Sequence, residues 1–192
     1  MRYVTLFLVA FSLSVSVSVL ATAKEDKYLA ALSNQLNFRE ASSYAFHTNN
    51  RNIEIGVERI DKDGMKRLLG NNTKKYTPFD VAVTNNTKFR IYINQIVVSN
   101  ANNHAYPKID LSDVHDAIDP GGKGNKDDMR DAALRNNLFN KAMAHTILSP
   151  GETVQGIVFV KSKHLDEGAL LLLQIQNMKR VAFMDFNAPL NK

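Results

Sequence analysis

Hydrophobic and polar residues alternate with a period of two in several short stretches of the chain, which is the pattern of a strand with one buried face. These stretches are 53–60 (IEIGVERI), 79–84 (FDVAVT) and 89–94 (FRIYIN). The sequence NNTK between the last two is turn-forming, so we expect Phe79–Ser99 to form a β-hairpin. A second hairpin is expected to join Ala169–Gln176 to Val181–Phe186.

The stretch Leu148–Val160 (LSPGETVQGIVFV) departs from this alternation. It begins with the turn-forming step Ser149-Pro150-Gly151 and ends with Ile157–Val160, which are apolar at consecutive positions. A strand of this kind needs cover on both faces. We therefore expect it to be the central strand of the fold.

Two other stretches have apolar residues at helical spacing, and we expect helices over Lys24–Glu40 and Asp127–Thr146. The long polar segment before the second helix is rich in Asn, Asp and Gly, as functional or mobile loops are. Within it, Leu111–Ile118 has the pattern of a short helix, and Gly121–Gly124 resembles a flexible hinge more than a phosphate-binding loop.

Strands separated by turns, with one helix inserted between them, predict a mainly-β antiparallel sandwich rather than an α/β fold. We expect three parts: a signal peptide at 1–23, an N-terminal helix and linker at 24–52, and a sandwich domain at 53–192.

The first 23 residues have the pattern of a secretory signal peptide: a positive charge at Arg2, an apolar run over Val4–Leu20, and small residues at Ala21–Ala23. The alternative is a membrane anchor, but the run is short for a spanning helix and contains four serines. Cleavage after Ala23 leaves residues 24–192. We expect a periplasmic or extracellular protein without an integral membrane segment.

The 192-residue chain contains no Cys, which excludes disulfides, thiolate metal sites, Cys nucleophiles and a lipid anchor on Cys. Its formal net charge is +5, and the basic residues are scattered among acidic ones. A nucleic-acid partner is therefore not expected, because nucleic-acid surfaces concentrate their positive charge in one patch or stripe.

The densest group of metal-ligand side chains lies in the long polar segment. Its candidate ligands are His104, His115, Asp113 and Asp116. The alternative is a solvated loop, because no histidines pair at helical spacing and the EF-hand pattern is not met. The chain has no G-x-S-x-G motif, and Ser149 precedes a proline in a turn. We expect no catalytic residues and no cofactor.

The segments VAVTNNTKFRIYI and SPGETVQGIVFV, followed by a closing hairpin, resemble the immunoglobulin-like sandwiches of small exported bacterial proteins. The resemblance covers about Ile53–Phe186, and the inserted helix departs from it. It implies a fold but no active-site residues. The first function expected is binding of a protein partner, as an accessory of an envelope or secretion assembly. The alternative is a periplasmic binder of a metal or small molecule.

Overall fold

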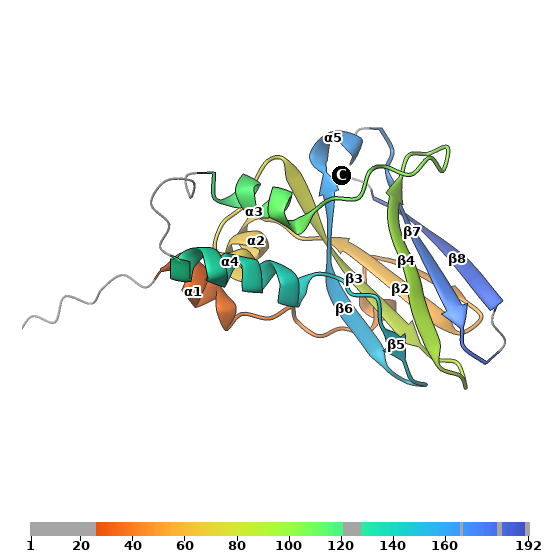
Figure 1. The fold of residues 1–192 in the computed structure, drawn as a ribbon. Coiled ribbons are helices and arrows are strands. Elements are labelled where there is room, and N and C mark those ends of the chain that lie inside the picture. Colours follow the sequence, from red (N-terminus) through yellow and green to blue (C-terminus); the bar gives the residue numbers. More distant parts are fainter. Residues whose placement is uncertain (1–25, 121–127, 166, 180–181, 191–192) are drawn as a thin grey trace, which may run out of the picture.

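The computed structural model describes residues 26–120, 128–165, 167–179 and 182–190. The predicted signal peptide and the glycine-rich hinge at 121–124 lie outside these ranges. Two four-stranded antiparallel sheets make the chain mainly β, and several helices lie beside them (Figure 1).

Sheet A has the strand order β1-β2-β3-β6, and sheet B has the order β5-β4-β7-β8. The strands of sheet A are β1 (Phe46–Asn50), β2 (Ile53–Arg59), β3 (Tyr76–Asn85) and β6 (Thr153–Lys161). The strands of sheet B are β4 (Ile91–Ser99), β5 (Ile147–Leu148), β7 (Leu170–Asn177) and β8 (Ala182–Pro189). β1 belongs to the segment before residue 53, so this segment contributes a strand to the sheet.

The main hydrophobic core lies between the two sheets, as expected for a sandwich. Alternate side chains of each strand point into it, which accounts for the period-two pattern of the sequence. From sheet A come Ile53, Ile55, Val57, Phe79, Val81 and Val83, and from sheet B come Ile91, Ile93, Leu171, Leu173, Ile175 and Phe186. All of these side chains are buried.

The predicted hairpin over Phe79–Ser99 is wrong, although both of its strands exist. β3 pairs with β2 and β6 in sheet A, whereas β4 pairs with β5 and β7 in sheet B. The buried side chain of Asn85 organises the connection by accepting from the Thr87 N–H (3.1 Å) and donating to the Phe89 carbonyl (2.8 Å). This turn therefore carries the chain from one sheet to the other. The second predicted hairpin is confirmed, because β7 pairs with β8 along its whole length.

The strand predicted to be central, β6, is instead the edge strand of sheet A. The fully buried strand is β3, every residue of which is buried. β6 is apolar on both faces because Val160 packs between the sheets while Ile157 and Phe159 pack against helices. The apolar pattern of β6 indicated that both of its faces are packed against other elements. It did not indicate that a strand pairs with each of its edges.

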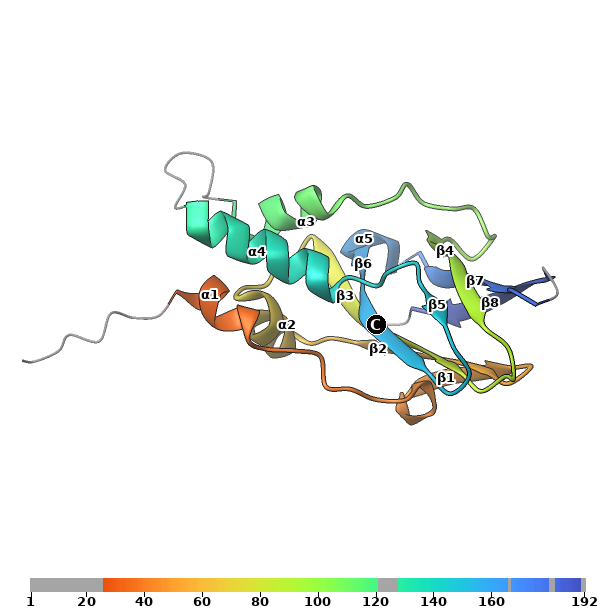
Figure 2. The same cartoon turned by 60° about the horizontal axis from the view of Figure 1, so that its bottom comes forward.

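Four helices gather at one end of the sandwich (Figures 1 and 2). They are α1 (Lys27–Leu32), α2 (Lys62–Leu69), α3 (Leu111–Ile118) and α4 (Asp128–Lys141), and a fifth short helix, α5 (Ser162–Leu165), follows β6. They enclose a second hydrophobic core, which includes Tyr28, Leu68, Leu134 and Leu138 and reaches Ile157 and Phe159 of β6. The insert between β4 and β5 thus contains two helices.

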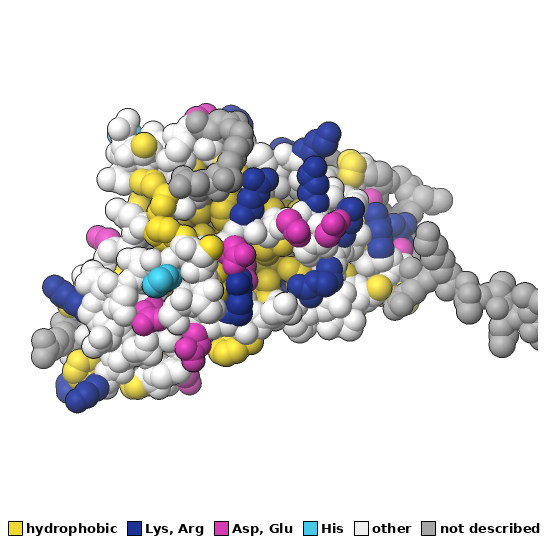
Figure 3. All heavy atoms as spheres, turned by 180° about the vertical axis from the view of Figure 1, so that it is seen from behind, with side chains coloured by type: hydrophobic (Ala, Val, Ile, Leu, Met, Phe, Trp, Pro, Cys, Tyr) yellow, Lys and Arg dark blue, Asp and Glu magenta, His cyan; other side chains and the backbone are white. Residues whose placement is uncertain are grey.

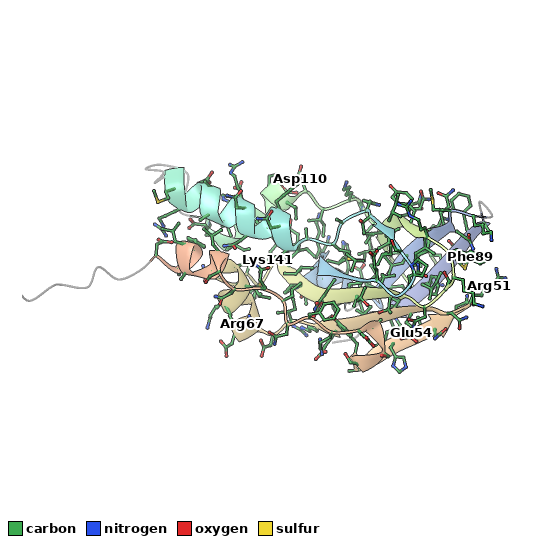
Figure 4. The ribbon with its side chains drawn as sticks, turned by 90° about the horizontal axis from the view of Figure 1, so that it is seen from below. Arg51, Glu54, Arg67, Phe89, Asp110 and Lys141 are labelled. Atoms are coloured by element: carbon green, nitrogen blue, oxygen red, sulfur yellow. The ribbon has the colours of Figure 1, made fainter. Side chains whose placement is uncertain are left out.

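Lys141 joins three of these helices from a buried position (Figure 4). Its ammonium donates to the carbonyls of Ala31 at the end of α1 and Leu68 in α2, both at 2.9 Å, and to Asn137 Oδ1 at 2.5 Å. Carbonyls at helix C-termini lack intrahelical donors and carry partial negative charge. Burial and the nearby Arg67 guanidinium lower the pKa of Lys141 to about 8.

The predicted helix over Lys24–Glu40 is much shorter in the structure, where only Lys27–Leu32 is helical in the described part. Beyond the C-cap Ser33, Asn34 donates its side-chain amide to the Arg67 carbonyl of α2 (2.9 Å). It then crosses sheet A in an extended form, and the Asn37 carbonyl accepts from Gln155 of β6 (2.9 Å). The N-terminal segment is therefore docked on the sandwich.

None of the helices in the described ranges is long and apolar enough to cross a membrane. Seen from the side opposite Figure 1, the surface carries basic and acidic side chains next to one another (Figure 3).

Candidate binding cleft between the sheets

A cleft of about 780 Å3 lies between β4 of sheet B and β6 of sheet A. Its walls come from both strands, from residues 106–111 before α3 and from the end of α4 and the segment after it. Most of the lining is apolar. It includes Ile96, Val98, Ile109, Phe139, Met143 and Val158. Phe139 is 77% exposed, which is unusual for a phenylalanine and places an apolar ring in solvent beside the cleft.

The cleft exists because the strand beside β4 is very short. β5 pairs only with Ile91 and Tyr92, and the register of β4 shifts between Ile93 and Gln95. Beyond this irregularity no strand covers the edge of β4 among the described residues, and only Tyr106 donates to it, through its N–H to the Val98 carbonyl (2.8 Å). The space between β4 of sheet B and β6 of sheet A is therefore not filled by a strand of the described residues.

On the opposite wall, the chain after α4 crosses β6 at Gly156. The Met143 N–H donates to the Ile157 carbonyl (2.9 Å), and Ala142 forms a parallel bridge with Ile157. A Cβ atom on Gly156 would lie 2.5 Å from Met143 Cα, so glycine is needed for this approach. α4 therefore ends at Lys141, earlier than the predicted Thr146, because the following residues are extended along β6.

Three polar side chains hold the loop and α5 together beside the cleft. The rings of Tyr106 and His164 are stacked with centroids 3.7 Å apart. Glu167 Oε2 accepts from the Tyr106 hydroxyl (2.6 Å) and lies 3.1 Å from His164 Nδ1. The bond from Tyr106, followed by that to His164, lowers the pKa of Glu167. The same bond raises the pKa of Tyr106, because the neutral phenol is the donor.

Charged and titratable side chains occupy the rest of the lining. Lys108 and Lys161 contribute two cations, and His145 Nδ1 lies 3.2 Å from the Ile93 carbonyl. The carboxylate of Asp110 is already engaged, because it caps α3 by accepting from the Ser112 N–H (2.9 Å). That bond lowers the pKa of Asp110. The lining therefore has an apolar floor with an excess of cations.

The predicted metal ligands do not gather around a common point. His104 is exposed in the loop after β4, whereas His115 is buried on α3. His115 Nε2 lies 3.0 Å from Asp131 Oδ1 of α4, and its Nδ1 lies 3.3 Å from Asp116. His115 thus links α3 to α4, and Asp113 lies exposed in the first turn of α3. The described residues contain no group of three or more His, Cys, Asp or Glu side chains placed to hold a metal ion.

The sequence patterns did not indicate the cleft or the residues that line it. One sequence feature is related to the cleft. Ile157–Val160 are apolar at consecutive positions, and a strand of this kind at the edge of a sheet leaves apolar surface next to that edge. The contributions of Tyr106, Phe139 and His164 had no such signal, because they come from three separate segments.

No protein-family model matches the chain, and no curated protein sequence matches it. A solved structure with partial similarity is the X-ray structure of Northeast Structural Genomics Consortium target SoR45, which is 12% identical in sequence. The match covers 71% of this chain and 79% of that chain, with a TM-score of 0.28. Similarity at this level identifies neither a family nor a function.

Proposed function

We propose that the protein is an exported, non-enzymatic binding protein whose cleft between β4 and β6 receives an extended, apolar segment of a partner protein. The observation that carries this proposal is the apolar cleft of about 780 Å3, which opens beside incompletely covered strand edges. Uncovered edges and apolar grooves are the two features used when a peptide is added to a sheet as an extra strand.

The backbone of β6 offers bonding groups on the cleft side. Asn85 of β3 donates its N–H to the Glu152 carbonyl (2.9 Å). This bond shows which alternate residues of β6 direct their backbone groups toward β3. Ile157, Phe159 and Lys161 therefore direct their backbone groups away from β3. The Met143 N–H donates to the Ile157 carbonyl, so a segment of the protein itself already bonds to this edge of β6. A partner segment would continue this pairing toward Lys161.

The charges of the lining favour an acidic residue in the partner segment. Lys108 and Lys161 place two cations in the lining against the single carboxylate of Asp110, which caps α3 and lies near Lys108. Complementary charge steers association and fixes the register of an otherwise apolar contact. The expected partner segment is therefore apolar at alternate positions and carries at least one Asp or Glu.

An immunoglobulin-like fold and export to the periplasm or the exterior belong to the same proposal. The strand orders β2-β3-β6 and β5-β4-β7-β8 parallel the A-B-E and C′-C-F-G orders of immunoglobulin-like domains. In this correspondence β1 is an additional edge strand, and the two insert helices stand between the C′ and C positions. Export rests on the sequence pattern of residues 1–23.

A second candidate function is binding of a small apolar molecule, which the size of the cleft favours. Pockets for small molecules typically have volumes of about 300–1,000 Å3, with apolar walls and a few polar groups. Lys108 and Lys161 would then meet an anionic group of the ligand. The protein partner is preferred because the strand edges add backbone bonding groups that a small apolar molecule would leave unused.

Site-specific photocrosslinking tests the proposal. The full precursor is expressed in its native host with p-benzoylphenylalanine in place of Phe139, which is 77% exposed and lines the cleft. The matched control carries the same residue in place of Phe38, which is 71% exposed in the extended N-terminal segment. A discrete protein adduct at position 139 that is absent at position 38 is expected.

Adduct formation should fall when Lys108 and Lys161 are both replaced by Glu, because the acidic residue of the partner would then be repelled. A lipid or other small molecule crosslinked at position 139, with no protein adduct, would establish the second candidate instead. Equal adducts at both positions, or none at either, would contradict both functions of the cleft.

A further inference from the structure

The outer face of sheet B carries three rows of side chains across β4, β7 and β8. The pairing registers place them side by side: Tyr92–Gln176–Phe183, Gln95–Gln174–Asp185 and Val97–Leu172–Asn187. These positions point away from the core, because their neighbours Ile93, Ile175 and Met184 pack into it. These side chains lie on the face of sheet B opposite the core, whereas the cleft runs along the edge of β4, and Val97 borders both.

The composition of this face is unusual for a solvent-exposed sheet. Among the nine positions only Asp185 is a charged residue type, although Asp, Glu, Lys and Arg make up 22% of the chain. Four positions are amides, two are aromatic and two are aliphatic. Phe183 is 52% exposed at one end. A face of planar polar groups beside exposed apolar ones can form hydrogen bonds and apolar contacts at the same time.

The Gln174 amide in the middle row is held in place by two hydrogen bonds. Asn94 Nδ2 donates to Gln174 Oε1 (2.5 Å), and Gln174 Nε2 donates to Asp185 Oδ1 (3.0 Å). Each of these groups has further donor or acceptor capacity, since an amide offers two N–H donors and a carbonyl oxygen with two lone pairs. The two bonds therefore fix the Gln174 side chain between β4 and β8, while its amide keeps further bonding capacity.

A hollow of about 420 Å3 lies over the second and third rows. Its wall is formed by Asn103 and Ala105 of the loop after β4, which bends over the sheet. The loop is held by the Asn100 side chain, whose oxygen accepts from the N–H groups of Asn102 (2.9 Å) and His104 (3.0 Å). The loop therefore raises one wall above the otherwise open face of the sheet.

We propose that this pocket binds an uncharged saccharide unit of a glycan chain, with Gln95, Gln174, Asp185 and Asn187 bonding its hydroxyl groups. Sugar hydroxyls both donate and accept, which matches amides and a carboxylate better than a lysine or arginine surface. The apolar C–H face of a sugar ring packs on aromatic or aliphatic surface. Val97 and Leu172 supply such surface within the pocket, and Phe183, two positions along β8 from Asp185, supplies it for a neighbouring sugar unit of the chain. The volume suits one or two sugar units. Protein–protein interfaces are enriched in arginine as well as in aromatic residues, whereas none of the nine positions on this face is arginine.

Isothermal titration calorimetry on residues 24–192 tests this proposal with four probes: chitotriose, cellotriose, maltotriose and a soluble peptidoglycan glycan fragment. Saturable binding of at least one probe is expected, with a dissociation constant in the micromolar to low millimolar range. Phe183→Ala and Gln174→Leu should each weaken that binding at least tenfold. Phe38→Ala, which removes a comparably exposed ring elsewhere, should leave it unchanged.

Circular dichroism establishes that each variant is folded. If one of the two variants does not fold, the other still tests the proposal. Absence of saturable binding by all four probes would overturn the proposal. Binding that persists in both Phe183→Ala and Gln174→Leu would overturn it as well. Loss of a crosslinked protein partner in these variants, without any saccharide binding, would assign the face to a protein instead.

Discussion

The substitution Gly156→Ala examines the crossing that forms one wall of the cleft. The added Cβ would lie 2.5 Å from Met143 Cα, 2.7 Å from Met143 N and 3.0 Å from the Ala142 carbonyl carbon. Ordinary carbon contacts begin at about 3.4 Å, so the crossing segment must move by about 1 Å. All of the opposing atoms are backbone, and no flexible side chain can yield in their place.

The expected cost follows from three contributions. Overpacking of this kind costs about 2 kcal/mol, and loss of the bond from the Met143 N–H to the Ile157 carbonyl costs about 1 kcal/mol. The substitution also reduces the conformational entropy of the unfolded chain, which stabilises the folded state by about 0.7 kcal/mol. The free energy of unfolding should therefore fall by about 2 kcal/mol, which lowers the melting temperature by about 4–8 °C for a domain of this size.

Urea unfolding measures the change in stability, and amide hydrogen exchange measures it locally. Protection of the Met143 amide should fall at least tenfold more than protection of amides in β7. Gly151→Ala is the matched control, because Gly151 has a φ of 81° but no atom near its Cβ position. It should cost about 1 kcal/mol through backbone strain and leave Met143 protected. Unchanged or increased stability of Gly156→Ala would refute the reasoning.

Other substitutions test further contacts. Lys141→Met should lower the free energy of unfolding at pH 7 by about 2–4 kcal/mol, since two helix-end carbonyls and Asn137 lose their donor. The pKa of Lys141 is lowered to about 8 in the folded chain. The unfolded chain therefore binds more protons between pH 8 and about 10.4, so wild-type stability should rise with pH there. Urea unfolding should show no such rise in Lys141→Met. Tyr106→Phe should raise the pKa of Glu167 toward its usual value, as followed by NMR titration, because the hydroxyl donor is lost. An unchanged Glu167 titration would mean that the bond does not form in solution. Amino-terminal sequencing of the protein isolated from its native host should begin at Lys24, and an intact Met1 would contradict the predicted cleavage.

Local sequence patterns predicted most strands and the pairing of β7 with β8, but not the other strand partners. The segments around Val81 and Ile91 have the alternation of a hairpin and a turn between them, yet they belong to different sheets. Alternation reports which face is buried, and the same pattern arises whether two strands pair edge to edge or face each other across a core. Only the nonlocal pairing of β3 with β6 and of β4 with β7 distinguishes the two arrangements.

The candidate sites were less accessible to sequence reasoning than the fold. His115 was expected as a metal ligand because Asp residues surround it in sequence. In the structure it packs between two helices and faces Asp131, which is distant in sequence. The cleft and the pocket on the outer face of sheet B are each assembled from separate strands and loops. Their residue types are ordinary one by one, so only their juxtaposition in space reveals a site.

The three hydrogen bonds of Lys141 also determine when the protein can complete its folding. The bond from Lys141 to Ala31 joins residues 110 positions apart, and the neighbouring bond from Asn137 to Tyr28 spans 109 positions. During synthesis, α1 therefore emerges long before the side chains that hold it. Contacts of such long range slow folding and leave early segments exposed in the growing chain. Chains truncated before residue 137 should keep α1 open to proteolysis, however well their strands form.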